Sequence, residues 1–126
     1  MARILVVDDE ETIRDLLRTV LRRLGHEVLL ADRGQKGIEV FRRERPQITI
    51  LDLNMPDLDG IAVLKEVRTV DPQASVIMLT GSGTEALERQ AGELGATDFL
   101  AKGFSLHALG QALKRVLSQP GNTASA

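Results

Sequence analysis

The chain has 126 residues, of which 43% are hydrophobic and 27% charged, a composition typical of one globular domain that buries its own core. A net charge of -2 argues against a general nucleic-acid binder, and the absence of cysteine excludes disulfides and thiolate metal sites. No apolar run approaches the roughly 20 residues that span a bilayer, and no secretory signal is recognisable, so we expect a cytoplasmic protein.

Strand-like and helix-like patterns alternate along the whole chain. Five short apolar runs have the length of buried strands, at residues 4–7, 28–31, 48–51, 76–79 and 99–101. Each is followed by apolar residues at helical spacing, at about 13–24, 34–45, 61–70, 84–94 and 106–117. The helix at 84–94 is predicted to be weak, because its apolar stripe is thin and Gly92 interrupts it. It is either a movable element or a helix with little to bury.

This alternation predicts successive βαβ units, a parallel sheet and right-handed crossovers. The strands are almost continuously apolar, which suits a sheet covered on both faces. We therefore predict an α/β, doubly wound (βα)5 flavodoxin-like fold, with five parallel strands in the order 2-1-3-4-5 and helices on both faces. Residues 1–118 form this domain, and residues 119–126 form a polar tail or the start of a linker.

Four of the five predicted strands end in side chains suited to phosphoryl transfer. Asp8 and Asp9 follow the first strand, Asp52 follows the third, Thr80 the fourth and Lys102 the fifth. In the predicted strand order these ends meet at one edge of the sheet. Crowded carboxylates favour a divalent cation, and Mg²⁺ prefers oxygen ligands. The sequence therefore predicts a magnesium site, a carboxylate nucleophile, and a hydroxyl and an ammonium for phosphoryl oxygens.

Each of these residues also has a plainer interpretation. The acids after the first strand, or Glu10 beside them, can cap the following helix, and Asp52 can simply open a turn. Thr80 and Lys102, taken singly, are ordinary surface residues. Their joint placement at the ends of neighbouring strands favours the functional interpretation.

The segments VVDDE, LDLNMPDLDG, MLTG and GATDFLAK together resemble the receiver domain of bacterial two-component response regulators, over roughly residues 2–118. The resemblance implies a signalling switch rather than an enzyme that acts on other molecules. It implies that Asp52 accepts a phosphoryl group from a sensor histidine kinase, a phosphotransfer protein or a small donor such as acetyl phosphate. The domain would then catalyse its own dephosphorylation.

The same resemblance assigns roles to the residues around Asp52. It implies that Mg²⁺ is held by Asp8, Asp9, the Asp52 carboxylate and the backbone carbonyl of Asn54. It implies that Thr80 and Lys102 contact the phosphoryl oxygens.

The resemblance also implies a switch and a set of partners. Phe99 would turn inward when Thr80 shifts, and the face formed by residues 84–94, 99–101 and 106–117 would change its partner preference. The expected partner is a downstream effector protein or an output domain, with weak dimerisation on phosphorylation and no direct contact with nucleic acid or membrane.

A row of arginines lies on the first predicted helix, at positions 14, 18 and 22. The row is either a solvated face or a docking surface for the kinase or phosphotransfer partner.

One position departs from the family pattern. Receivers usually carry proline after the lysine, often in a cis peptide bond, whereas this chain has Gly103. A cis bond before a residue other than proline costs about 2.5–4 kcal/mol, so we predict a trans bond here. The direction of Lys102 and the start of the last helix are less constrained as a result.

Two other interpretations stay open at this stage. A degenerate receiver would use the fold only to bind another protein. A phosphatase of the haloacid dehalogenase type would also use an aspartate nucleophile and magnesium, but such enzymes place Asp-x-Asp after the first strand, where this chain has Asp8 and Asp9 in adjacent positions.

Overall fold

The computed structural model describes residues 1–118 and contains five strands and five helices in strict alternation. In chain order the elements are β1 (Arg3–Val7), α1 (Glu11–Arg23), β2 (Glu27–Ala31), α2 (Gly34–Glu44), β3 (Ile48–Asp52), α3 (Gly60–Val70), β4 (Ser75–Thr80), α4 (Glu85–Glu93), β5 (Asp98–Ala101) and α5 (Leu106–Leu117). The predicted polar tail at residues 119–126 lies outside the described residues.

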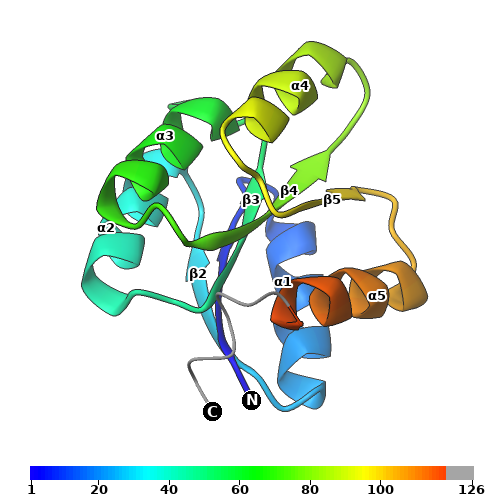
Figure 1. Cartoon of the computed structure of the whole chain (residues 1–126). Helices are drawn as coiled ribbons and strands as arrows, with labels where there is room; N and C mark the ends of the chain where they lie inside the picture. Colours follow the sequence, from blue (N-terminus) through cyan, green and yellow to red (C-terminus); the bar gives the residue numbers. More distant parts are fainter. Residues whose placement is uncertain (119–126) are drawn as a thin grey trace.

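All five strands pair in parallel, in the order β2-β1-β3-β4-β5, which confirms the predicted topology. Helices α1 and α5 cover one face of the sheet, and α2, α3 and α4 cover the other (Figure 1). The winding reverses between β1 and β3, so these two neighbouring strands deliver their carboxyl ends to the same place on the sheet edge.

Two hydrophobic cores, one on each face, hold the layers together. On the α1 side Leu17 and Leu21 are fully buried, which contributes roughly 1.5–3 kcal/mol for each side chain. After α1 the chain turns at Gly25, whose φ of 91° is open to glycine at little cost. On the other face α4 buries only Ala91 completely. The prediction of a thin apolar stripe on α4 is therefore confirmed.

The loop after β3 is anchored by a contact that was not predicted from the sequence. The Asp57 carboxylate accepts hydrogen bonds from the backbone N–H groups of Gly34 (2.9 Å) and Gln35 (3.0 Å), at the start of α2. Asp59 caps α3 in the usual way, because its side chain accepts from the Ala62 N–H at 2.8 Å. The loop that follows Asp52 is thus fastened to two helices.

Candidate functional site

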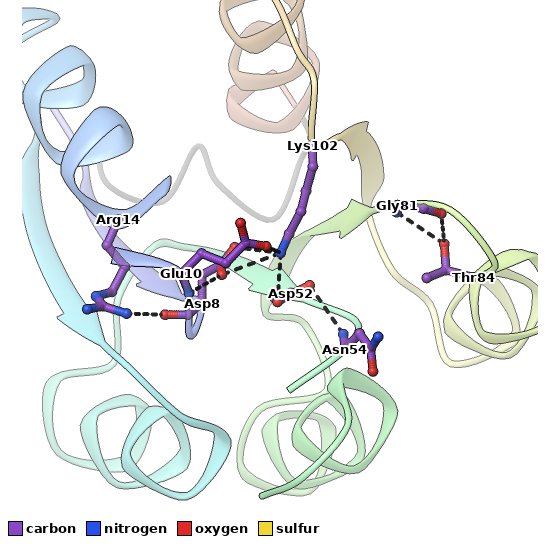
Figure 2. Close-up of polar contacts among 8 residues, drawn as sticks. All are labelled: Asp8, Glu10, Arg14, Asp52, Asn54, Gly81, Thr84 and Lys102. Atoms are coloured by element: carbon purple, nitrogen blue, oxygen red, sulfur yellow. Dashed lines mark hydrogen bonds and ion pairs between the residues drawn. The ribbon is translucent and has the colours of Figure 1, made fainter. Parts of the chain in front are cut away.

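The carboxylates predicted to share a site lie side by side at the carboxyl ends of β1 and β3. Asp8 is completely buried and Asp52 is 2% exposed, whereas Asp9 is exposed. Lys102, which follows β5, reaches across the sheet edge to both buried acids (Figure 2). Its Nζ lies 3.0 Å from Asp52 Oδ2 and 3.4 Å from Asp8 Oδ2. The predicted convergence of opposite charges is present.

Backbone contacts fix the two buried acids in place. Asp8 Oδ1 accepts a hydrogen bond from the Glu10 N–H at 2.8 Å, and Arg14 on α1 donates to the Asp8 carbonyl at 2.8 Å. Asp52 Oδ1 accepts from the Asn54 N–H at 3.2 Å. Arg14 therefore has a structural partner, and the interpretation of the whole arginine row as a solvated face is wrong at this position.

The capping interpretation of the first acids is only partly correct. Glu10 occupies the N-cap position of α1, but its side chain makes no capping hydrogen bond. The Asp8 carboxylate instead accepts the Glu10 N–H. The Glu10 carboxylate is turned toward Lys102, with which it forms an ion pair (Figure 2).

Strand pairing sets the position of Lys102. Thr80 pairs with Ala101 in the β4–β5 register, and the Lys102 N–H donates to the Thr80 carbonyl at 2.8 Å. Every peptide bond among residues 1–118 is trans, including the one before Gly103. Lys102 therefore reaches the acids without the proline that receivers usually carry at the next position.

Burial and repulsion shift the ionisation of this cluster. Burial raises the pKa of the Asp8 carboxyl to about 6; the hydrogen bond from the Glu10 N–H opposes this rise, and the Asp52 charge adds to it. Burial also raises the pKa of Asp52, although the Lys102 ammonium and the Asn54 N–H oppose the rise. Burial lowers the pKa of Lys102, but its contacts with Glu10 and Asp52 outweigh this effect and leave the pKa raised. Burial of the ionised Asp8 and Asp52 carboxylates therefore costs free energy. A metal cation bound beside them would reduce this cost.

The donor set at this edge suits a hard divalent cation. Carboxylate oxygens of Asp8, Asp9 and Glu10 all lie within 4.8 Å of one another. Asp8 Oδ2 is buried and has no hydrogen-bond partner, which leaves an oxygen lone pair for a metal or for water. An all-oxygen set of this kind fits Mg²⁺ better than a metal that prefers nitrogen or sulfur ligands. Asp8 and Asp9 of the predicted ligand set belong to this group, and Glu10 lies beside them.

A pocket of about 360 Å³ opens beside the acids. Its lining residues are Asp9, Glu10, Asp52, Asn54, Gly81, Ser82, Thr84 and Lys102. The two predicted switch residues lie outside this lining: Thr80 is partly exposed at the end of β4, and Phe99 is partly buried against the core on the α2, α3 and α4 side.

The N–H of Gly81, the residue after β4, already has a hydrogen-bond partner. It donates to the hydroxyl of Thr84 at 3.2 Å, and that hydroxyl lies 2.7 Å from the Gly81 carbonyl (Figure 2). This contact was not predicted from the sequence. A hydroxyl residue three positions after a glycine that follows a strand is the signal that indicates such a turn.

Replacement of Asp8 by asparagine should stabilise the metal-free protein at neutral pH. The folded-state pKa of about 6 lies above the ordinary value of 3.8, so the wild type loses stability as the pH rises from about 4 to about 6. Asparagine retains the oxygen that accepts the Glu10 N–H but carries no charge. We expect a gain on the order of 2 kcal/mol in the free energy of unfolding at pH 7.5, which shrinks toward pH 4.5. Urea unfolding at the two pH values checks this, and equal gains at both would contradict it.

Comparison with known proteins identifies the family. The family model of the response regulator receiver domain matches residues 4–114 of the chain. The chain belongs to this family. Among solved structures, a response regulator receiver domain protein from Clostridium thermocellum matches with a TM-score of 0.89 and 33% identity, covering 93% of this chain and 94% of that one.

Curated relatives fall into two length classes. The chemotaxis protein CheY of Bacillus subtilis is 33% identical over 117 residues, which are 92% of this chain and 98% of that protein. The probable transcriptional regulator ycf27 of Pyropia yezoensis is 43% identical over 116 residues, which are 91% of this chain but only 47% of that protein. This receiver domain thus spans about half the length of the ycf27 regulators and nearly all of CheY.

As a receiver, the chain works in two-component phosphorelay signalling, as a signalling domain rather than a classical enzyme. Within residues 1–118, no helix is both long enough and apolar enough to cross a membrane.

Proposed function

We propose that this receiver accepts a phosphoryl group on Asp52 and later removes it by its own hydrolysis. The observation that carries the proposal is the contact of Lys102 with Asp52 and Asp8 beside a pocket lined by polar residues. A buried carboxylate held next to an ammonium is a nucleophile in a site already arranged to neutralise phosphoryl charge.

The transfer forms one bond and breaks one. A carboxylate oxygen of Asp52 attacks phosphorus, and the bond between phosphorus and the donor atom breaks, with the electron pair leaving on the donor. The ammonium of Lys102 and the hydroxyl of Thr80 receive the phosphoryl oxygens, and the Gly81 N–H joins them once it leaves Thr84. In dephosphorylation, water attacks the same phosphorus and the bond between phosphorus and the Asp52 oxygen breaks, with its electron pair returning to the carboxylate. Inorganic phosphate leaves, and the water loses its proton to the phosphate or to solvent.

Magnesium is the proposed cofactor. Asp8, Asp9, the Asp52 carboxylate and the Asn54 carbonyl would hold it, and the ion would neutralise charge on the phosphoryl oxygens. The buried Asp8 oxygen without a hydrogen-bond partner, and the raised pKa values of Asp8 and Asp52, support a cation at this place.

The partners are proposed from the family. The donor is a sensor histidine kinase or a phosphotransfer protein in the cytoplasm, and the row of Arg18 and Arg22 on α1 offers it a basic surface. Phosphorylation would move Thr80 and Phe99 and thereby change the α4-β5-α5 face for an effector protein or an output domain. Residues 1–118 constitute the receiver, and 119–126 a tail or linker.

Incubation with radiolabelled acetyl phosphate tests the proposal. We expect labelling that requires Mg²⁺, saturates at one phosphoryl group per chain and disappears when a chelator is present from the start. The label should survive acid and be lost in base, as an acyl phosphate is. Equal labelling with and without Mg²⁺, or a label stable to base, would contradict the proposal.

A further inference from the structure

Glu10 provides a third anion for the ammonium of Lys102. Its carboxylate pairs with Lys102 Nζ, which also contacts Asp52 Oδ2 at 3.0 Å and Asp8 Oδ2 at 3.4 Å. A lysine ammonium has three N–H donors, and Lys102 directs them to Glu10, to Asp52 Oδ2 and, at 3.5 Å, to Asp8 Oδ1. A phosphoryl oxygen can bind Lys102 only if one carboxylate leaves.

The three carboxylates differ in how easily they can leave. The Asp8 and Asp52 side chains are 0% and 3% exposed, whereas the Glu10 side chain is 50% exposed. Glu10 can therefore move into water without a large desolvation change, and the buried aspartates cannot. Glu10 is the group that an arriving phosphoryl oxygen displaces.

Glu10 also lines the pocket beside Asp52, where a phosphodonor must enter. Its negative charge repels a small anionic donor at the point where that donor approaches the lysine. We propose that Glu10 is a specificity-determining residue that competes with the phosphodonor for Lys102 and so slows phosphorylation by free small anions. This inference rests on the proposed phosphorylation of Asp52.

The backbone of Glu10 is fixed independently of its carboxylate. Its N–H donates to Asp8 Oδ1 at 2.8 Å, and its carbonyl accepts from Ile13 and Arg14 at 3.1 Å each. Replacement by glutamine keeps these bonds and the side-chain length, and removes only the charge. The substitution therefore tests the competition for Lys102 while the turn between β1 and α1 keeps its structure.

The test compares wild type, Glu10→Gln and Glu11→Gln in the initial rate of labelling by acetyl phosphate at saturating Mg²⁺. Glu11 is an exposed neighbour in the first turn of α1 and serves as the charge-matched control. We expect the initial labelling rate of Glu10→Gln to exceed that of wild type by roughly three- to tenfold at low ionic strength, and by less in high salt. The rate of Glu11→Gln should stay within about twofold of wild type. An unchanged or slower rate for Glu10→Gln would overturn the inference, as would an equal gain for Glu11→Gln.

A binding measurement separates competition from metal ligation. Beryllofluoride mimics a carboxylate-bound phosphoryl group, and its affinity should rise in Glu10→Gln by a factor similar to the rate gain. The affinity for Mg²⁺ alone, measured by calorimetry, should change less than about threefold, because the lost charge is partly exposed. A large loss of Mg²⁺ affinity would instead make Glu10 a metal ligand and overturn the competition.

The Asp52→Asn variant keeps the two proposals distinguishable. If it labels as well as the wild type, the proposed function fails. If labelling requires Asp52 but Glu10→Gln brings no acceleration, only the inference about Glu10 fails.

Discussion

Replacement of Gly60 by alanine should destabilise the domain by about 3 kcal/mol and impair phosphorylation together with stability. A Cβ atom at this position would lie 2.4 Å from the carbonyl oxygen of Asp52 and 2.7 Å from the Cα of Leu53. Both are backbone atoms, so no side-chain rotation relieves the overlap. The Gly60 N–H also donates to the Leu53 carbonyl at 2.8 Å, which ties α3 to the residue just after Asp52.

Gly92→Ala is the matched control for this variant. Gly92 is an exposed glycine inside α4, and a Cβ atom there would meet no other atom within 4 Å. We expect this substitution to stabilise the domain by about 0.5–1 kcal/mol, because alanine is the better helix former. Urea unfolding of both variants measures the contrast. A loss below about 1 kcal/mol for Gly60→Ala would show that the Asp52 backbone is not packed as described.

Replacement of Lys102 by methionine should reduce labelling by acetyl phosphate on the order of 100-fold, because the site loses its preorganised cation for the phosphoryl oxygens. The same change should destabilise the metal-free protein by about 2 kcal/mol at neutral pH, since Asp8 and Asp52 then lack a counter-ion. The lysine holds down carboxylate pKa values that burial raises, so its removal raises them further. The added destabilisation should therefore grow as the pH rises and nearly vanish at acidic pH, where both carboxyls are protonated.

Lys65→Met is the control for the loss of a surface ammonium. Lys65 is exposed on α3, and the described residues offer its side chain no ion pair. Its replacement should leave the labelling rate within about twofold of wild type and the stability within about 0.5 kcal/mol. Equal effects of the two substitutions would show that Lys102 acts only as general surface charge.

The fold was predictable because each local pattern agreed with the global arrangement. Buried parallel strands read as apolar runs, and the helices between them, with α1 as the plainest case, carry apolar residues at helical spacing. Some boundaries shifted by one or two residues, because polar residues that flank an apolar run still join a strand or stand at a helix end. Glu27 joins β2 because it pairs with Arg3 in the register, although it is exposed, and α4 starts at Glu85 rather than Thr84.

The residues of the candidate site were predictable where their place at the end of a strand determines where they lie. Asp8 and Lys102 follow strand ends, Asp52 is the last residue of its strand, and a parallel sheet necessarily gathers strand ends at one edge. The carboxylate of Glu10 and the hydroxyl of Thr84 were missed, because their contacts depend on how a side chain turns after the strand has ended. Asp57 escaped notice for a related reason: its partners at the start of α2 are more than 20 residues away in sequence.

The most direct test of the central claim is to locate the phosphoryl group on the intact wild-type chain. Protein labelled by acetyl phosphate in Mg²⁺ is digested at acidic pH, and the modified peptide is sequenced by mass spectrometry. The account predicts one modified residue, Asp52, in the peptide that contains the end of β3. A label on a histidine, a hydroxyl or any other carboxylate, with Asp52 unmodified, would contradict it.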